Sequence, residues 1–120
     1  MINKKYRLIV NGNKLDTTLS KPPVFIAGDE FITAETGYPR IAMEMGKSGK
    51  VVVSFTVDKF GKTKDFHVKN RIGFGLDEEA IRVLKFFPDF WLPGILNGVP
   101  VDVEVEIPFS FANLGVINKN

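Results

Sequence analysis

The sequence predicts an α+β domain built as a three-stranded antiparallel sheet with two helices packed on one face. Three patterns lead to this fold class: strict alternation of apolar and polar residues in 99–111, similar alternation in 51–57, and apolar residues at helical spacing in 76–87. Alternation buries one face of a strand, whereas a spacing of three and four residues buries one side of a helix. With 120 residues, 44% of them hydrophobic, the chain can fill one core.

The N-terminal residues 1–21 are expected to form an extension ahead of the main domain. Residues 6–10 favour a strand, and the turn signal Asn11-Gly12-Asn13 can fold that strand back on the residues that follow. The sequence therefore allows an extra N-terminal strand or small hairpin. The main domain is expected over residues 22–112, and residues 113–120 are expected to be a flexible tail.

The first half of the main domain contains a helix and a hairpin. Residues 24–36 are expected to be mostly loop, with one helical turn over 29–34. Tyr38-Pro39 then opens the first helix, because proline is favoured at the first helical position. Alternation in 51–58 predicts a strand, and a glycine in the short loop after it lets residues 63–70 return antiparallel.

The second half supplies the other helix and the last strand. Residues 76–87 form the helix, and 89–98 form an aromatic loop that leads into the strand 99–111. A strand, helix, strand connection crosses the face of a sheet, whereas a hairpin keeps its strands adjacent. We therefore expect 51–58 in the centre, between 63–70 and 99–111, which is the order 2-1-3.

The last strand is expected to form an open edge of the sheet. Pro100 and Pro108 have no backbone N–H to donate and are tolerated mainly at edges. They share even parity with Asp102, Glu104 and Glu106, so in a regular strand the backbone groups of these acids face outward. An open edge accepts another extended chain, and the sequence therefore predicts a docking edge between the two prolines. A β-bulge between them would shift this parity.

Composition excludes several function classes. The formal net charge is +2 with acids and bases interspersed, which is too balanced for a nucleic-acid binder that works through a dense basic patch. The absence of cysteine excludes disulfides, thiol catalysis and cysteine-ligated metals. No apolar run approaches the length of a membrane span, and the first residues show no export signal.

The sequence contains no convincing catalytic, cofactor-binding or metal-binding group. His67 is the only histidine and is expected to face solvent. The three acids of the last strand lie roughly 7 Å apart, which is too wide for neighbours to share a cation or proton. Gly73-Phe74-Gly75 lacks the further glycine of a dinucleotide loop. The aromatic residues in 86–91 favour a core over a ligand cage or stacking platform.

Several short motifs occur in a specific order along the chain. They are Tyr38-Pro39 with Ile41-Ala42, Gly49-Lys50-Val51-Val52-Val53-Ser54-Phe55-Thr56-Val57, Gly61-Lys62, Asp77-Glu78-Glu79-Ala80, Trp91-Leu92-Pro93-Gly94, Asn97-Gly98-Val99-Pro100-Val101 and Pro108-Phe109. Taken together in this order, the motifs resemble the TonB C-terminal domain family, and the resemblance covers roughly residues 22–111.

This resemblance implies a non-enzymatic periplasmic domain without a cofactor. It implies that the domain docks the TonB box of outer-membrane TonB-dependent transporters by β-strand addition, and so couples inner-membrane energy to transport. Membrane anchoring would come only through a segment absent from this chain, which would tether the full-length protein to the inner membrane. The residues that the resemblance assigns to peptide binding are Glu35, Thr36, Gly37, Tyr38, Pro39, Val101, Asp102, Val103, Glu104, Val105, Glu106 and Ile107.

Two alternatives stay open at this point. The same domain occurs in other periplasmic or membrane signalling proteins, so the chain is alternatively a TonB-like interaction or dimerisation domain of such a protein. An open edge strand can also pair with its own copy and give a homodimer.

Overall fold

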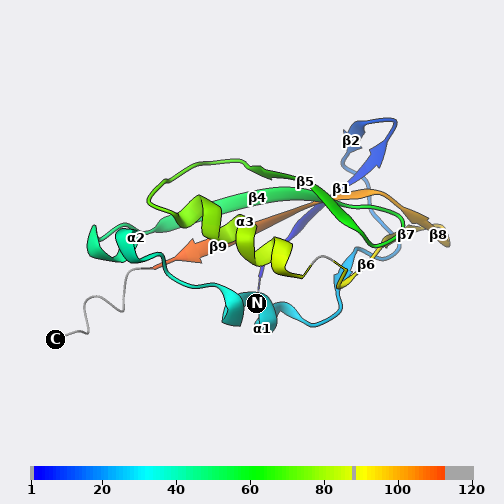
Figure 1. Cartoon of the computed structure of the whole chain (residues 1–120). Coiled ribbons are helices and arrows are strands. Elements are labelled where there is room, and N and C mark those ends of the chain that lie inside the picture. The colour runs from blue at the N-terminus through cyan, green and yellow to red at the C-terminus, as the bar shows by residue number, and fades with distance from the viewer. Residues whose placement is uncertain (1, 88, 113–120) are drawn as a thin grey trace.

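The computed structural model describes residues 2–87 and 89–112, and it contains a five-stranded antiparallel sheet with three helices (Figure 1). The sheet has five strands because the N-terminal hairpin that the sequence allows adds two strands to the three expected from the main domain, beside the last strand. In spatial order the strands are β2 (Asn13–Leu15), β1 (Lys5–Val10), β9 (Val103–Phe111), β4 (Gly49–Val57) and β5 (Thr63–Val68).

Strands β4 and β9 form the centre of the sheet and of the core. They pair in one unbroken register from Gly49 opposite Phe111 to Val57 opposite Val103. Their alternating apolar side chains share one face, because successive side chains of a strand point to opposite faces. That face is buried through Val51, Val53, Phe55, Val57, Val103, Val105, Ile107, Phe109 and Phe111.

Three helices are present where two were expected. They are α1 (Asp29–Glu35), α2 (Arg40–Glu44) and α3 (Leu76–Phe86). Helix α1 extends the single helical turn that the sequence predicts over 29–34. Helix α3 packs on the apolar face of the sheet, and its buried residues are Leu76, Asp77, Ala80, Val83 and Leu84.

Two short ladders flank the main sheet, and they change the prediction for the last strand. β3 (Val24–Phe25) pairs with β6 (Trp91–Leu92), and β7 (Gly94–Leu96) pairs with β8 (Val99–Val101). The strand predicted over 99–111 is therefore interrupted at Asp102, because β8 ends at Val101 and β9 begins at Val103. Pro100 lies opposite Ile95 in the β7–β8 ladder and does not bound the edge of β9.

The aromatic residues near the end of α3 are partly core and partly surface. Trp91 is buried, and its ring lies 5.3 Å from that of Phe25 and 5.4 Å from that of Phe55. Phe86 and Phe90 remain exposed. The core interpretation therefore fits Trp91 and does not fit every aromatic residue of this stretch.

None of the helices described is long and apolar enough to cross a membrane. Within residues 2–87 and 89–112, no group of three histidine, aspartate or glutamate side chains is placed to hold a metal ion. The predicted tail, 113–120, lies outside the described residues.

Candidate functional site at the outer edge of strand β9

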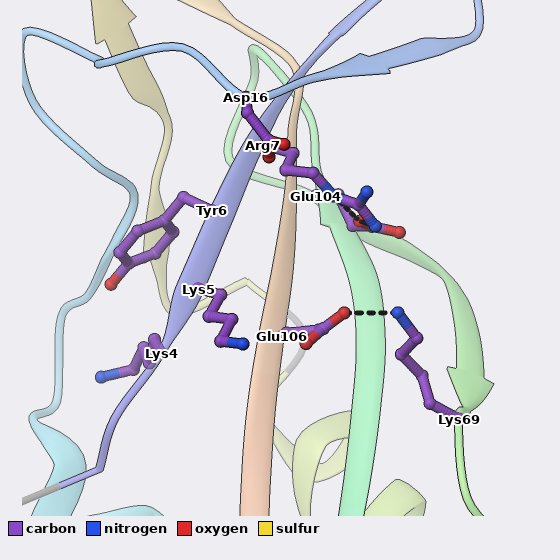
Figure 2. Close-up of a pocket in the computed structure, with 8 residues that line it drawn as sticks. All are labelled: Lys4, Lys5, Tyr6, Arg7, Asp16, Lys69, Glu104 and Glu106. Atoms are coloured by element: carbon purple, nitrogen blue, oxygen red, sulfur yellow. Dashed lines mark hydrogen bonds and ion pairs between the residues drawn. The ribbon is translucent and has the colours of Figure 1, made fainter.

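Strand β1 covers half of the edge that the sequence predicts to be open. Residues Lys5 to Leu8 pair antiparallel with Glu106 to Val103, and Figure 2 shows the ribbons of β1 and β9 side by side. In the described part of the chain, no strand pairs with this side of β9 beyond Glu106. The expectation that the whole edge is unpaired is therefore wrong, and the open part is limited to the C-terminal half of β9.

The predicted direction of the backbone groups agrees with the ladder. The N–H of Ile9 donates to the carbonyl of Asp102 at 3.0 Å, so Asp102 presents its backbone to β1. Hydrogen-bonded pairs alternate along an antiparallel ladder, and the register is continuous from Leu8 to Lys5. The N–H and C=O groups of Glu104 and Glu106 therefore also point to the outer edge, where they pair with the backbone of β1.

Glu104 is the most enclosed of the acids on this strand, with 5% of its surface exposed. Its carboxylate accepts hydrogen bonds from Arg7 at 2.8 Å and 3.1 Å (Figure 2). Its second oxygen lies 2.9 Å from the ammonium of Lys14. Burial alone raises the pKa of Glu104, but the hydrogen bonds from Lys14 and Arg7 outweigh it and lower the pKa below its usual value. Both partners come from the N-terminal hairpin.

The other two acids of the predicted edge bind within the main domain. The ammonium of Lys69 lies 2.6 Å from the carboxylate of Glu106, and the N–H of Lys59 donates to the carboxylate of Asp102 at 2.8 Å. These contacts leave the outward-facing side chains of the edge engaged with neighbouring strands and loops. The backbone, rather than the acids, is what the edge can offer to another chain.

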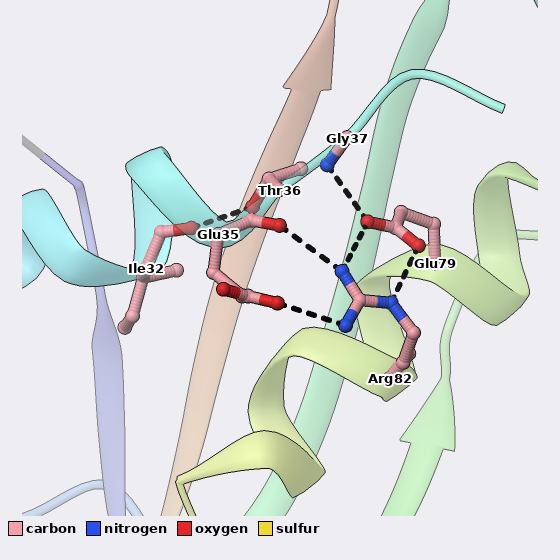
Figure 3. A network of polar contacts seen from close by, with 6 residues as sticks. All are labelled: Ile32, Glu35, Thr36, Gly37, Glu79 and Arg82. Atoms are coloured by element: carbon pink, nitrogen blue, oxygen red, sulfur yellow. Dashed lines mark hydrogen bonds and ion pairs between the residues drawn. The ribbon is translucent and has the colours of Figure 1, made fainter.

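The loop 35–39 lies at the other end of β9 and is fixed by α3. The guanidinium of Arg82 donates to the Glu35 carboxylate and to the Glu35 carbonyl, each at 3.0 Å (Figure 3). It also makes two 2.8 Å hydrogen bonds to Glu79, whose carboxylate accepts the N–H of Gly37 at 2.7 Å. The hydrogen bond from Arg82 lowers the pKa of Glu79 despite its partial burial. These hydrogen bonds hold the loop 35–39 against helix α3.

The remaining loop residues are held by capping and ring contacts. Thr36 donates its hydroxyl to the carbonyl of Ile32 at 2.6 Å, and Pro39 is the residue that caps the start of α2. Tyr38 donates its hydroxyl to the carbonyl of Lys47, and its ring meets that of Phe111 edge-on at 5.9 Å.

A pocket of about 550 Å³ joins this loop to the open half of β9. Thr36, Gly37 and Tyr38 line one wall, and residues 108–112 line another. The third side is formed by Ile2 and Asn3, just before β1 begins. The loop residues that the resemblance assigns to the site therefore lie beside the end of β9.

The structure thus divides the predicted site residues into two groups. Thr36, Gly37 and Tyr38 line the pocket, and Glu35 and Pro39 flank them in the chain. Residues 103–106 instead pair with β1, and Val101 pairs with Gly94 in the β7–β8 ladder. Sequence reasoning missed residues 108–111 as the open part of the edge. A signal for them existed in Pro108, whose missing N–H is best tolerated on the side where no partner accepts from it.

Comparison with known proteins agrees with this architecture. The family model described as Gram-negative bacterial TonB protein C-terminal matches residues 34–112. The chain is also similar to two solution structures of the Helicobacter pylori TonB C-terminal domain, each at 25% identity over 70% of this chain. The structure of residues 179–285 has a TM-score of 0.53 and is covered over 75% of its length, and that of residues 194–285 has a TM-score of 0.52 and is covered over 87%.

No curated protein sequence matches the chain. The family model, however, spans well over half of the 120 residues, and the matched region includes β4, β5, α3 and β9. The chain therefore belongs to the TonB C-terminal family, a family of periplasmic protein-interaction domains and not a known enzyme family.

Proposed function

We propose that this chain docks the TonB box of outer-membrane TonB-dependent transporters by β-strand addition at the outer edge of β9, and so couples inner-membrane energy to transport. The observation that carries the proposal is the open half of β9, where the pocket joins residues 108–112 to the loop 36–38. An extended segment bound in this pocket can contact both the end of β9 and the loop 36–38.

The backbone of β9 would supply the binding contacts. Ser110 has the same parity as Asp102, and the register of β9 with β4 has no shift between Val103 and Phe111, so its N–H and C=O face the open side. Pro108 contributes only a carbonyl there. Each backbone hydrogen bond is worth about 0.5 to 1.5 kcal/mol net, so such docking tolerates variation in the sequence of the partner.

The loop 35–39 would give the site its shape. Arg82 and Glu79 fix Glu35 and Gly37 from α3, and Tyr38 packs on Phe111 at the end of the edge. A bound segment on β9 would therefore run alongside a loop whose position is already set, which reduces the entropy lost on binding.

A titration of the isotope-labelled chain with peptides from transporter TonB boxes tests the proposal. We expect backbone amide shifts at residues 104–110 and at Thr36, Gly37 and Tyr38. Perturbations confined to the helices, and absent from β9, would exclude docking by strand addition.

A second function remains compatible with the family. The chain would then be the interaction domain of another periplasmic or membrane signalling protein, with the same β9 edge binding a different extended segment. Binding of peptides from such a partner, with none from transporters, would favour this function.

A further inference from the structure

We propose that the N-terminal hairpin β1–β2 is a removable strand that occupies the docking edge of β9, and that a partner segment must replace β1 to use that edge in full. This inference rests on the proposed function, because it assigns the regulation of the same site. It follows from three observations: the length of the open edge, the way the hairpin is attached, and the side-chain pattern of β1.

The open part of the edge offers fewer backbone hydrogen-bonding groups than the part that β1 covers. Between Ile107 and Phe111 the outward backbone groups are the carbonyl of Pro108 and the N–H and C=O of Ser110. The covered part adds an N–H and a C=O from each of Glu104 and Glu106, together with the carbonyl of Asp102 that now binds Ile9. Most backbone hydrogen-bonding groups on the outer edge of β9 therefore become available to a partner only when β1 leaves.

Few apolar contacts attach the hairpin to the domain. Leu8 is the only residue in β1 and β2 that is buried, and Tyr6, together with Ile2 ahead of the hairpin, is partly buried against the core. In β2, all three residues are exposed, and Figure 1 shows the hairpin projecting beyond the end of the sheet. A strand with so little buried apolar surface belongs to the low-stability part of a fold, which opens without global unfolding.

Ion pairs between cations of the N-terminal segment and carboxylates of the main domain also attach the hairpin. Arg7 and Lys14 bind Glu104, and Lys4 lies 2.6 Å from the carboxylate of Asp29 in α1. In each pair the cation belongs to the N-terminal segment and the carboxylate to the main domain. The hairpin is therefore held to the domain largely by electrostatic contacts, in which the Glu104 carboxylate is buried while Arg7 and Lys14 remain partly exposed.

The side chains of β1 also show what kind of segment fits the edge. Lys5 and Arg7 lie on the same face as Glu106 and Glu104, whereas Tyr6 and Leu8 face the core side. The edge therefore fits an extended segment in which basic and apolar residues alternate. The chain's own β1 is one such segment.

A reversible lock tests whether β1 must leave. Lys5 and Glu106 are register partners, and a hydrogen-bonded pair has Cα atoms about 5.5 Å apart, which suits a disulfide. Since the described chain has no cysteine, Lys5→Cys with Glu106→Cys introduces the only pair. The oxidised and reduced forms of one protein then differ only in whether β1 can move.

The probe is a labelled synthetic peptide that copies residues 4–10, Lys-Lys-Tyr-Arg-Leu-Ile-Val. We expect the reduced form to bind it at least 10-fold more tightly than the oxidised form. Equal binding by both forms would overturn the proposal. Because the probe is not a transporter segment, this result is independent of whether transporters are the partners.

A second variant loosens the hairpin without changing β9. Arg7→Gln with Lys14→Gln removes both partners of Glu104 that lie on the hairpin, and we expect the peptide to bind this variant at least threefold more tightly than the unmodified chain. Lys64→Gln, an exposed cation on β5, is the control and should leave binding unchanged. Failure of both the reduced and the loosened protein to bind the peptide would show that β1 is not replaceable.

Hydrogen exchange of the unmodified chain gives a measurement that needs no peptide. The amides of Glu104 and Glu106 face β1, whereas those of Val103 and Val105 face β4. We expect the first pair to exchange at least 10-fold faster than the second, and the oxidised lock to remove the difference. Equal protection of the two pairs would overturn the proposal.

Discussion

At the residue scale, single carboxylates do more for this fold than the sequence indicates. The three acids at 77–79 are expected from the sequence to favour the start of a helix, through its positive end. In the structure Asp77 is buried, and its two oxygens accept the N–H groups of Ile72 and Gly73 at 2.9 Å and 2.8 Å. The sequence could not predict this role, because it depends on how the loop before α3 folds back.

Replacing Asp77 by alanine tests this role. The substitution leaves two part-buried N–H groups without their acceptor, and we expect the free energy of unfolding to fall by about 2 kcal/mol. Asp89→Ala is the matched control, because its carboxylate is exposed and pairs with Lys62 only at the surface, so a change below about 0.5 kcal/mol is expected. Denaturant unfolding of both variants provides the measurement, and equal losses would contradict the account.

The ion pairs of Glu104 predict a pH dependence of stability. Its folded-state pKa is lowered, so the stability it contributes is present above the unfolded pKa of about 4.3 and is lost as the pH falls through the folded value. We therefore expect Glu104→Gln to reduce the free energy of unfolding more at pH 6 than at pH 3. A gap between the two proteins that stays constant over this range would contradict the assignment.

At the element scale, the periodicity of apolar residues predicts strands and helices, but it does not predict which strand pairs with the edge of another. The alternation in 51–57 and the apolar spacing in 76–87 gave β4 and α3 nearly at their observed bounds, Gly49–Val57 and Leu76–Phe86. The N-terminal hairpin follows from its turn signal, yet its pairing with β9 joins residues about a hundred positions apart. No local signal specifies such a contact, and β1 therefore changed the predicted edge.

The network around Arg82 connects two elements that are distant in sequence, and its removal is a test at this scale. Arg82→Gln keeps the exposed surface of α3 but gives up the charged hydrogen bonds to Glu35 and Glu79. We expect a several-fold weaker affinity for transporter peptides with a loss of stability below about 1 kcal/mol, because the guanidinium is half exposed. Calorimetric titration measures the affinity. Arg71→Gln, an exposed arginine outside the network, is the control, and an equal loss of affinity there would argue against a role for the loop.

At the scale of the whole molecule, an N-terminal hairpin outside the matched family region covers half of the outer edge of β9. The sequence resemblance predicted the domain and its class, since the motifs that carry it lie mainly in the loops and strands of residues 38–109. It could not predict the hairpin, because residues 1–33 lie outside the matched region.

Coverage of the β9 edge also bears on oligomeric state. A homodimer through this edge would require β1 to leave both copies, and β5 on the opposite side carries a register shift that disturbs pairing. We therefore expect the chain to sediment as a monomer independent of concentration. A dimer that forms with rising concentration, and that the oxidised Lys5→Cys with Glu106→Cys lock abolishes, would instead support exchange of β1 between copies.

Site-directed cross-linking to a transporter segment tests whether the bound segment lies along β9. Ser110→Cys places a thiol on the open half of β9, and His67→Cys places one on β5, the opposite edge of the sheet. TonB-box peptides with a cysteine at successive positions are then mixed with each variant under mild oxidation. The account predicts disulfides at residue 110, strongest at alternate peptide positions, and few at residue 67; equal or preferential cross-linking at residue 67 would contradict it.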